Sequence, residues 1–153
     1  MKQKLILFLL MFLPLFLVSC NDEPDGKLSG IWKMTSVDEI SYQKDSSGHW
    51  VVSYEDRDTY GDNEGSNGLL FKSNNLVQEI DGVLKDGSYD WSGSTFEYKI
   101  ENGHIYFHEL DDADTDGWED GGKIKISGKV LELTEEEVSS NYKDTRILKY
   151  KKV

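Results

Sequence analysis

Apolar and polar residues alternate with a period of two along most of the chain from Lys27 onward. In the run TFEYKI (residues 95 to 100), the apolar residues Phe96, Tyr98 and Ile100 fall on one face, and the polar residues between them fall on the other. Successive side chains of a β-strand point to opposite faces, so this alternation predicts half-buried strands.

Short apolar or alternating runs of this kind recur down the chain, and glycine, asparagine and aspartate separate them at intervals of about ten residues. This spacing is typical of an all-β sandwich or barrel. The runs are GIWKMTSV (30 to 37), HWVVSYE (49 to 55), GLLFK (68 to 72), LVQEI (76 to 80), GSYDW (87 to 91), TFEYKI (95 to 100), HIYFHEL (104 to 110), KIKIS (123 to 127), VLELT (130 to 134) and TRILKYKK (145 to 152).

Two connections predict tight hairpins, ENG at residues 101 to 103 and SGK at 127 to 129, because each glycine supplies the positive φ that such turns require. Two segments leave a helical alternative open. Residues 76 to 84 also fit a helical stripe, although Gly82 favours a bend between strands, and a short helical turn is possible at TEEEV (134 to 138). No predicted helix is long enough for a crossover, which disfavours parallel α/β folds.

The composition is acidic, with a formal net charge of −12 over 153 residues. A surface this negative repels phosphate backbones, so we expect no nucleic-acid partner. Aromatic residues make up 12% of the chain and β-branched residues recur throughout, which favours a folded domain over disorder.

The first residues predict a secretory signal peptide. Lys2 and Lys4 precede an uncharged run over residues 5 to 19, which is too short to span a bilayer and is interrupted by Pro14. The sequence LVSC, ending at Cys20, resembles the bacterial lipobox, in which a peptidase cuts before the cysteine. That resemblance implies a thioether-linked diacylglycerol and an acylated amino group on Cys20, and several acyl chains form a stable membrane anchor. The alternative is a free cysteine at the end of an uncleaved segment.

Three regions follow from this interpretation: a lipoprotein signal peptide at residues 1 to 19, a lipidated acidic tether at 20 to 27, and one β-barrel domain at 28 to 153. Removing the signal peptide removes two lysines, which takes the net charge from −12 to −14 and leaves 134 residues, a size suited to one core. Asn21, Asp22 and Glu23 look like the signal that sends some lipoproteins of Gram-negative bacteria to the outer face of the outer membrane. The alternative is a solvated tether that happens to be acidic.

The stretch LSGIWKM (28 to 34) is similar to the opening strand of lipocalins, whose Gly-x-Trp motif is here Gly30, Ile31 and Trp32. Residues 69 to 107 also look like the bacterial lipocalin-like domains carried by small lipoproteins. The resemblance spans most of residues 28 to 152. It implies an up-and-down antiparallel barrel of about eight to ten strands, closed at one end by Trp32. It also implies that an arginine near the last strand lies across the indole, and Arg146 is placed for this role. On a strand, Arg146 shares a face with Leu148 and Tyr150, which we expect to point inward.

The run DDADTDGWEDGGK (111 to 123) contains half of a calcium-binding loop. Asp112, Asp114 and Asp116 are followed by Gly117, which matches positions 1, 3, 5 and 6 of the loop that wraps Ca²⁺ in oxygen ligands. Position 12 is Lys123, where a bidentate glutamate belongs, so a solvated loop between two strands is the favoured interpretation and a Ca²⁺ site is the alternative.

We find no constellation that indicates an enzyme. Nucleophile elbows and phosphate-binding glycine loops are absent. His104 and His108 lie on one predicted strand at a separation of about 13 Å, too far to share a metal, and His49 could join only one of them. We therefore expect surface imidazoles and no cofactor.

The leading functional hypothesis is a non-enzymatic binding module for a small apolar ligand. A cavity of this kind would be lined by residues from the inward face of several strands, which we predict to be Met34, Phe71, Tyr98, Phe107 and Leu133. The rival hypothesis is a surface protein that binds glycan or host protein through acidic loops around residues 55 to 65 and 111 to 120. Trp50, Trp91 and Trp118 could serve such contacts, although tryptophans are also common in the core and its rim.

Overall fold

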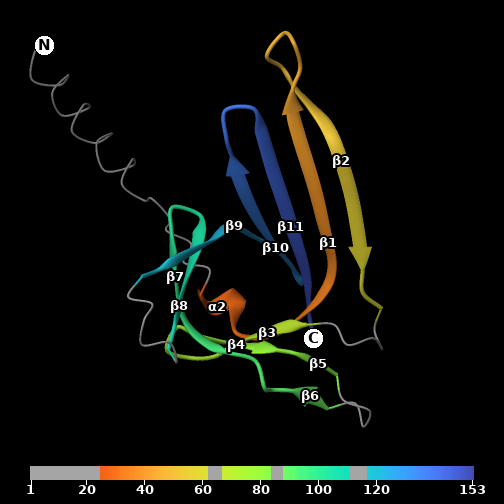
Figure 1. The fold of residues 1–153 in the computed structure, drawn as a ribbon. Coiled ribbons are helices and arrows are strands. Elements are labelled where there is room, and N and C mark those ends of the chain that lie inside the picture. Colours follow the sequence, from red (N-terminus) through yellow and green to blue (C-terminus); the bar gives the residue numbers. More distant parts are fainter. Residues whose placement is uncertain (1–24, 62–66, 84–87, 111–116) are drawn as a thin grey trace, which may run out of the picture.

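The structure, a computed structural model, describes residues 25–61, 67–83, 88–110 and 117–153, and most of them form antiparallel strands (Figure 1). Its elements are a four-residue helix α2 (Asp25–Leu28) and the strands β1 (Gly30–Lys44), β2 (Trp50–Thr59), β3 (Gly68–Phe71), β4 (Leu76–Ile80), β5 (Gly82–Val83), β6 (Tyr89–Asp90), β7 (Thr95–Glu101), β8 (His104–Glu109), β9 (Glu119–Ser127), β10 (Val130–Val138) and β11 (Tyr142–Lys152).

Eight strands form a closed antiparallel barrel. Their order around the barrel is β1, β3, β4, β7, β8, β9, β10 and β11, and pairing of β11 with β1 closes the ring. Within this set each strand lies beside its neighbour along the chain, which confirms the predicted all-β, up-and-down barrel. Strand β2 is added at the edge of β1, and β5 and β6 form a separate two-stranded ribbon.

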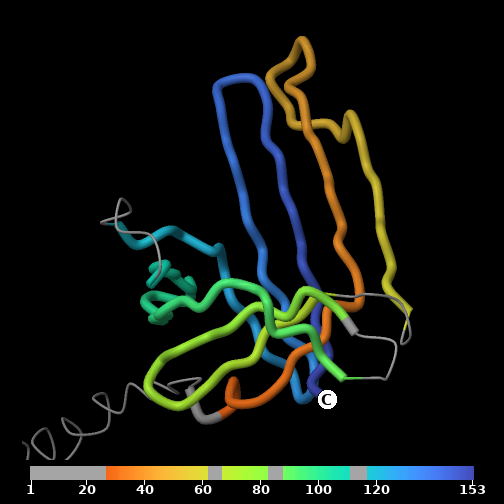
Figure 2. Tube along the Cα trace, turned by 60° about the horizontal axis from the view of Figure 1, so that its bottom comes forward, coloured from red at the N-terminus to blue at the C-terminus, as the bar shows by residue number. Residues whose placement is uncertain are grey.

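Strand β1 belongs to two parts of the fold. Its first residues, Gly30 to Lys33, pair with β3 inside the barrel, whereas Ser36 to Lys44 pair with β2. Strands β10, β11, β1 and β2 therefore continue past the barrel as a four-stranded sheet, which we call the projecting sheet (Figures 1 and 2). It rises from one side of the barrel.

The projecting sheet includes one of the two segments for which the sequence leaves a helical alternative open. Residues 134 to 138 are not a helical turn, because they continue β10 and pair with β11 from Thr134 to Val138. Because three consecutive residues of this segment are glutamates, the sequence shows no alternation of apolar and polar residues there. Glu136 accepts ion pairs from Lys143 (Nζ–Oε1, 2.7 Å) and Lys123 (Nζ–Oε2, 3.3 Å), which stabilise the acidic strand. The helical stripe at residues 76 to 84 is likewise not formed where the structure describes it, since β4 and β5 occupy residues 76 to 80 and 82 to 83.

Both predicted hairpins are confirmed. Strands β7 and β8 are joined by Asn102 and Gly103, which have φ values of 53° and 78°. Two consecutive residues with positive φ are typical of the type I′ turn, whose twist matches that of the strands. In the second hairpin, Gly128 has φ 61° between β9 and β10.

Trp32 closes one end of the barrel. It is fully buried, and its Nε1–H donates to the carbonyl oxygen of Leu28 at 2.6 Å, which holds α2 against the barrel. The cation over the indole is Lys152, whose Nζ lies 5.3 Å from the ring centroid and also donates to the Lys27 carbonyl at 2.9 Å. The chain is thus already ordered from Asp25, within the stretch assigned to the tether.

The predicted contact of Arg146 with Trp32 is wrong. The register of β1 and β11 places Lys152 opposite Trp32, whereas Arg146 lies opposite Glu39, seven residues further along β1. The predicted face of Arg146 is correct, because it points to the inside of the barrel with Leu148 and Tyr150. Gly30, the other structural residue of the motif, begins β1 with φ 114°, a conformation that favours glycine.

The outer face of the projecting sheet carries a buried carboxylate. Asp38 on β1 is only 5% exposed and accepts a bidentate contact from Arg57 on β2, including Nη2–Oδ2 at 3.0 Å. Lys149 on β11 donates to the same Oδ2 at 3.0 Å. Asp38 therefore ties three neighbouring strands together through their side chains.

Candidate functional site

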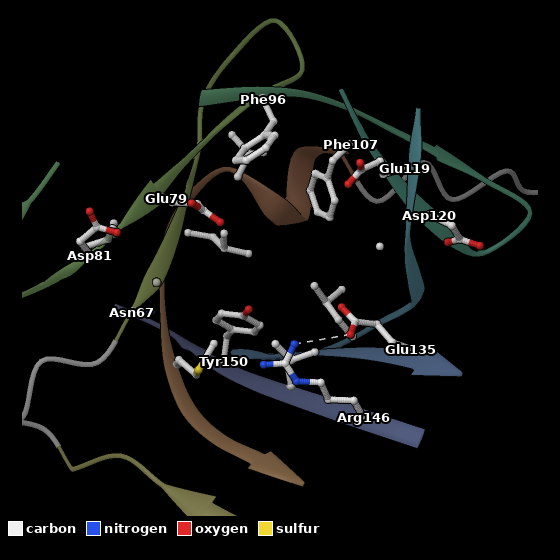
Figure 3. A pocket seen from close by; sticks show the side chains of 18 residues that line it. Asn67, Glu79, Asp81, Phe96, Phe107, Glu119, Asp120, Glu135, Arg146 and Tyr150 are labelled. Carbon is white, nitrogen blue, oxygen red and sulfur yellow. Dashed lines mark ion pairs between the residues drawn. The ribbon is translucent and has the colours of Figure 1, made fainter. Parts of the chain in front are cut away.

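A cavity of about 420 Å³ opens at the end of the barrel opposite Trp32, beside the base of the projecting sheet (Figure 3). Residues from eight strands of the fold and from the segments next to them contribute to its wall. They are Met34, Asn67, Gly68, Leu69, Val77, Glu79, Ile80, Asp81, Phe96, Phe107, Glu119, Asp120, Gly121, Leu133, Glu135, Arg146, Leu148 and Tyr150.

The deeper walls of the cavity are apolar. Phe96 and Phe107 meet edge to face with centroids 6.1 Å apart, and Figure 3 shows both rings on the side opposite Tyr150 and Arg146. Leu133 on β10 and Leu148 on β11 form a cross-strand pair. Such walls favour an apolar ligand body, because its burial removes apolar surface from water.

The structure places three of the five predicted lining residues, Met34, Phe107 and Leu133, at this cavity. The other two, Phe71 and Tyr98, do not line it. They are buried in the core, where their rings meet edge to face at 5.1 Å. Their strands bring them to the inward face as predicted, but at a depth where the barrel is filled by side chains.

A glycine pair on β9 makes room in the cavity for the Phe107 ring. A Cβ at position 121 would overlap that ring, and one at position 122 would overlap the backbone of Thr134. Gly122 also has φ 89°, and the register of β8 and β9 shifts nearby. The sequence EDGG therefore lets the strand bend inward where a side chain would block the space.

Arg146 lies between two carboxylates at the cavity mouth. It is on β11, with Glu39 opposite it on β1 and Glu135 opposite it on β10. The contacts are Nε–Oε1 of Glu39 at 3.6 Å and Nη1–Oε2 of Glu135 at 3.7 Å. Because two carboxylates share one guanidinium, this part of the wall keeps a net negative charge.

Two further glutamates face the cavity from other sides. Glu79 on β4 points toward the centre and Glu119 on β9 lies near Phe107 (Figure 3). Removal from water, followed by the nearby carboxylates Asp81 and Glu109, raises the pKa of Glu79 above its ordinary value, while a backbone hydrogen bond from Ser94 opposes the shift.

The aspartates at the cavity edge are already engaged. Asp81 accepts a hydrogen bond from the Ser92 hydroxyl at 2.8 Å. Asp120 contacts Nδ1 of His104 at 3.1 Å and accepts a bond from the Gly122 amide at 2.8 Å. These bonds hold the rim in place and leave the glutamates as the groups that face the open space.

Tyr150 brings a polar atom into the apolar part of the cavity. Its side chain is 5% exposed, and its hydroxyl points into the cavity (Figure 3). No described residue forms a hydrogen bond with this hydroxyl. Burial, then Glu135 and Glu79, raise the pKa of Tyr150 against the opposing effect of Arg146, so the phenol stays neutral.

A second, more polar hollow of about 710 Å³ runs along the projecting sheet beside the first. It shares Asp120, Glu135 and Arg146 with the cavity mouth and is otherwise lined mainly by charged residues and hydroxyls. We regard it as the approach to the cavity.

The other predicted sites lie apart from the cavity or outside the described residues. Cys20 and the calcium candidates Asp112, Asp114 and Asp116 fall outside them. Within the described ranges, no group of three or more histidine, cysteine or acidic residues is arranged to hold a metal ion. The three histidines do not cluster.

The three remaining tryptophans are partly exposed, between 38% and 41%, and lie at separate places. Trp50 begins β2 beneath Lys44 (Nζ to centroid 4.9 Å), Trp91 follows β6, and Trp118 precedes β9 beneath Lys99 (4.7 Å). Part of the segment predicted as an acidic loop at residues 55 to 65 is strand, since β2 runs to Thr59.

The predicted lining residues did not include Glu79, Glu135 or Tyr150. Glu135 follows the apolar Leu131 and Leu133 on the inward face of β10, and it pairs with Arg146 of β11. An inward-facing charge at the end of an apolar alternation was the available signal. Glu79 gave none, because it is an exposed acidic residue in a short strand.

No protein-family model matches the chain, and no significantly similar protein was found among curated proteins. None of the helical segments in the described ranges has the length and apolar character that a membrane crossing requires. The geometry of the barrel and its cavity is therefore the main indication of function.

Proposed function

We propose that this protein is a non-enzymatic binding module that takes up a small, mostly apolar ligand in the open end of its barrel. The observation that carries this proposal is the cavity of about 420 Å³, with apolar walls and a few polar groups. Small-molecule sites in proteins have volumes of roughly 300 to 1,000 Å³ and the same division between apolar walls and sparse polar groups. The resemblance to bacterial lipocalin-like lipoproteins supports the same function.

We further propose that the barrel is held at a membrane by lipid on Cys20 after removal of residues 1 to 19, on the outer membrane of a Gram-negative bacterium and facing outward. Helix α2 begins five residues after Cys20. Five extended residues reach at most about 18 Å, so the barrel would stay close to the lipid surface. Its ligand would then be captured at the membrane boundary.

The test of ligand uptake uses the chain from Asn21 onward, which contains every described strand and the whole described core. We expect N-phenyl-1-naphthylamine, an apolar dye that is neutral at pH 7, to bind with a rise in fluorescence. Met34→Trp fills the cavity and should weaken binding at least tenfold. Val130→Trp is the matched control, because Val130 is 46% exposed and lines neither cavity.

Circular dichroism confirms that both variants are folded before binding is compared. Absence of dye binding to the unmodified chain, or equal binding by Met34→Trp and the unmodified chain, would contradict ligand uptake in this cavity.

A second candidate function is a protein or glycan contact through β2. Trp50, Val52 and Tyr54 are exposed on this strand, at the outer edge of the projecting sheet. Exposed aromatic residues at such an edge suit partner binding. Whole bacteria carrying the triple variant Trp50→Ser, Val52→Ser, Tyr54→Ser should then lose adhesion to glycan or host-protein surfaces while dye binding is unchanged.

A further inference from the structure

The polar groups of the cavity are mostly negative, although its walls are apolar. Among the lining residues that the structure describes, five carboxylates accompany one guanidinium. Arg146 is already shared between Glu135 and Glu39, so it does not offset Glu79 or Glu119. The potential inside the cavity is therefore negative, and a partly desolvated site strengthens that potential.

The Tyr150 hydroxyl gives a second, independent indication of a ligand. The Tyr150 side chain is 5% exposed, its hydroxyl points into the cavity, and none of the described residues forms a hydrogen bond with it (Figure 3). The oxygen is not among the buried atoms without a partner, so it is open to the space of the cavity. A polar group on the wall of a mostly apolar site forms its hydrogen bond with water or with a polar group of the ligand, and such sparse groups fix the orientation of the ligand. A ligand group that reaches the centre of the cavity would supply that partner.

We propose that the ligand is a small organic cation, an apolar body carrying a protonated amine whose N–H donates to the Tyr150 hydroxyl between the carboxylates of Glu79 and Glu135. This inference rests on the proposed binding function and specifies its ligand class. The apolar body lies against Phe96, Phe107 and Leu133, and Glu119 adds negative charge on that side of the mouth.

Other ligand charges fit the site less well. A carboxylate or phosphate would meet Glu79 and Glu119, since Arg146 is the one cation among the described lining residues and already has two carboxylate partners. A neutral apolar ligand would leave Tyr150 unsatisfied and would place nothing beside the carboxylates. The neutral phenol of Tyr150 can accept a bond from an ammonium group and donate its own proton at the same time.

The experiment compares three probes with the same apolar body, octylammonium, 1-octanol and octanoate, by calorimetry at pH 7 and physiological salt. The protein is again the chain from Asn21 onward, and probe concentrations stay below micelle formation. We expect octylammonium to bind at least ten times more tightly than 1-octanol, and octanoate to bind more weakly than either.

Two variants test the named contacts. Glu79→Gln should reduce the preference for octylammonium over 1-octanol by at least threefold, and Tyr150→Phe should lower octylammonium affinity three- to tenfold through the lost hydrogen bond. Glu55→Gln is the matched control, since it makes the same charge change on exposed β2 and lines neither cavity. It should leave the preference unchanged.

The outcomes separate this inference from the proposed function. Equal binding of octylammonium and 1-octanol, or tightest binding of octanoate, would overturn the cationic ligand while ligand uptake stands. An equal loss of preference in Glu55→Gln and Glu79→Gln would also overturn it, because the effect would then come from overall charge. If neither the probes nor the neutral dye bind, both proposals fall.

Discussion

Replacing Asp38 by asparagine tests whether one buried carboxylate holds the projecting sheet together. The variant keeps the shape of the side chain but removes its charge and replaces one of its two acceptor oxygens by an NH₂ donor. Arg57 and Lys149 therefore lose their ion pairs and at least one of the hydrogen bonds that they donate to Asp38. A hydrogen bond to a charged group contributes about 1.5 to 3 kcal/mol, so the loss of one such bond costs about 2 kcal/mol before solvent is considered.

Solvent lowers this figure. The Arg57 side chain is 61% exposed and that of Lys149 is 33% exposed, and exposed ion pairs contribute only about 0.2 to 1 kcal/mol. We therefore expect Asp38→Asn to lower the free energy of unfolding at pH 7 by about 1.5 kcal/mol. For an m-value of about 2 kcal/mol/M in urea, the unfolding midpoint falls by roughly 0.75 M.

The pH dependence gives the sign of the effect. The Arg57 guanidinium, helped by Lys149 and opposed by burial, holds the pKa of Asp38 below its ordinary value in the folded protein. A lowered folded-state pKa contributes stability that is complete above the unfolded value of about 3.9 and is lost as the pH falls through the folded-state pKa. The difference between the unmodified chain and Asp38→Asn should be constant from pH 5.5 to 7.5 and should shrink below about pH 4.

The assay is equilibrium urea unfolding followed by tryptophan fluorescence, with Asp58→Asn as the control. Asp58 is an exposed carboxylate on the same strand as Arg57, and a surface change of this kind stays within about 0.5 kcal/mol. The reasoning is refuted if both variants are equally stable at pH 7, or if the effect of Asp38→Asn is unchanged at pH 3.

The remaining predictions concern the closed end, the bent strand and the anchor. Trp32→Phe leaves the Leu28 carbonyl without its donor and opens a void, so urea unfolding should show a loss of about 2 kcal/mol or more; a loss below 0.5 kcal/mol would contradict the closing role. Gly122→Ala meets positive φ and the Thr134 backbone, so a thermal melt should show a loss of about 2 kcal/mol or more, and an unchanged melting temperature would be inconsistent with the bend. Cys20→Ser should abolish labelling by a palmitate analogue in cells and move the protein out of the membrane fraction; retention of label would exclude this attachment site.

The strands could be predicted where one face is apolar and the other polar. Strand β7 follows residues 95 to 100 almost to the residue, because Tyr98 and its inward neighbours repeat with a period of two. Strands β1, β2 and β10 extend beyond the predicted runs. Their extra residues lie in the projecting sheet, where the inward face is charged or exposed, so the apolar signal ends before the strand does.

The candidate site was predictable only in part, since register is not visible in one sequence. Alternation placed Arg146 on the inward face correctly. Whether Arg146 or Lys152 lies opposite Trp32 depends on a pairing between strands at the two ends of the chain, which no local pattern specifies. For the same reason, the sequence does not show how deep each inward-facing residue lies in the barrel. Met34 and Leu133 reach the cavity, whereas Phe71 is buried in the core.

The ladder between β1 and β11 also bears on how the chain reaches its native state. It joins Trp32 to Lys152, about 120 residues apart, and it is the seam that closes the ring. Contacts between distant segments slow folding, because the entropy of a long loop is lost before the contacts form. The seam cannot form until the last strand has emerged, so an exported chain would acquire its closed barrel only after translocation is complete, and until then its apolar inward face would depend on protection from aggregation.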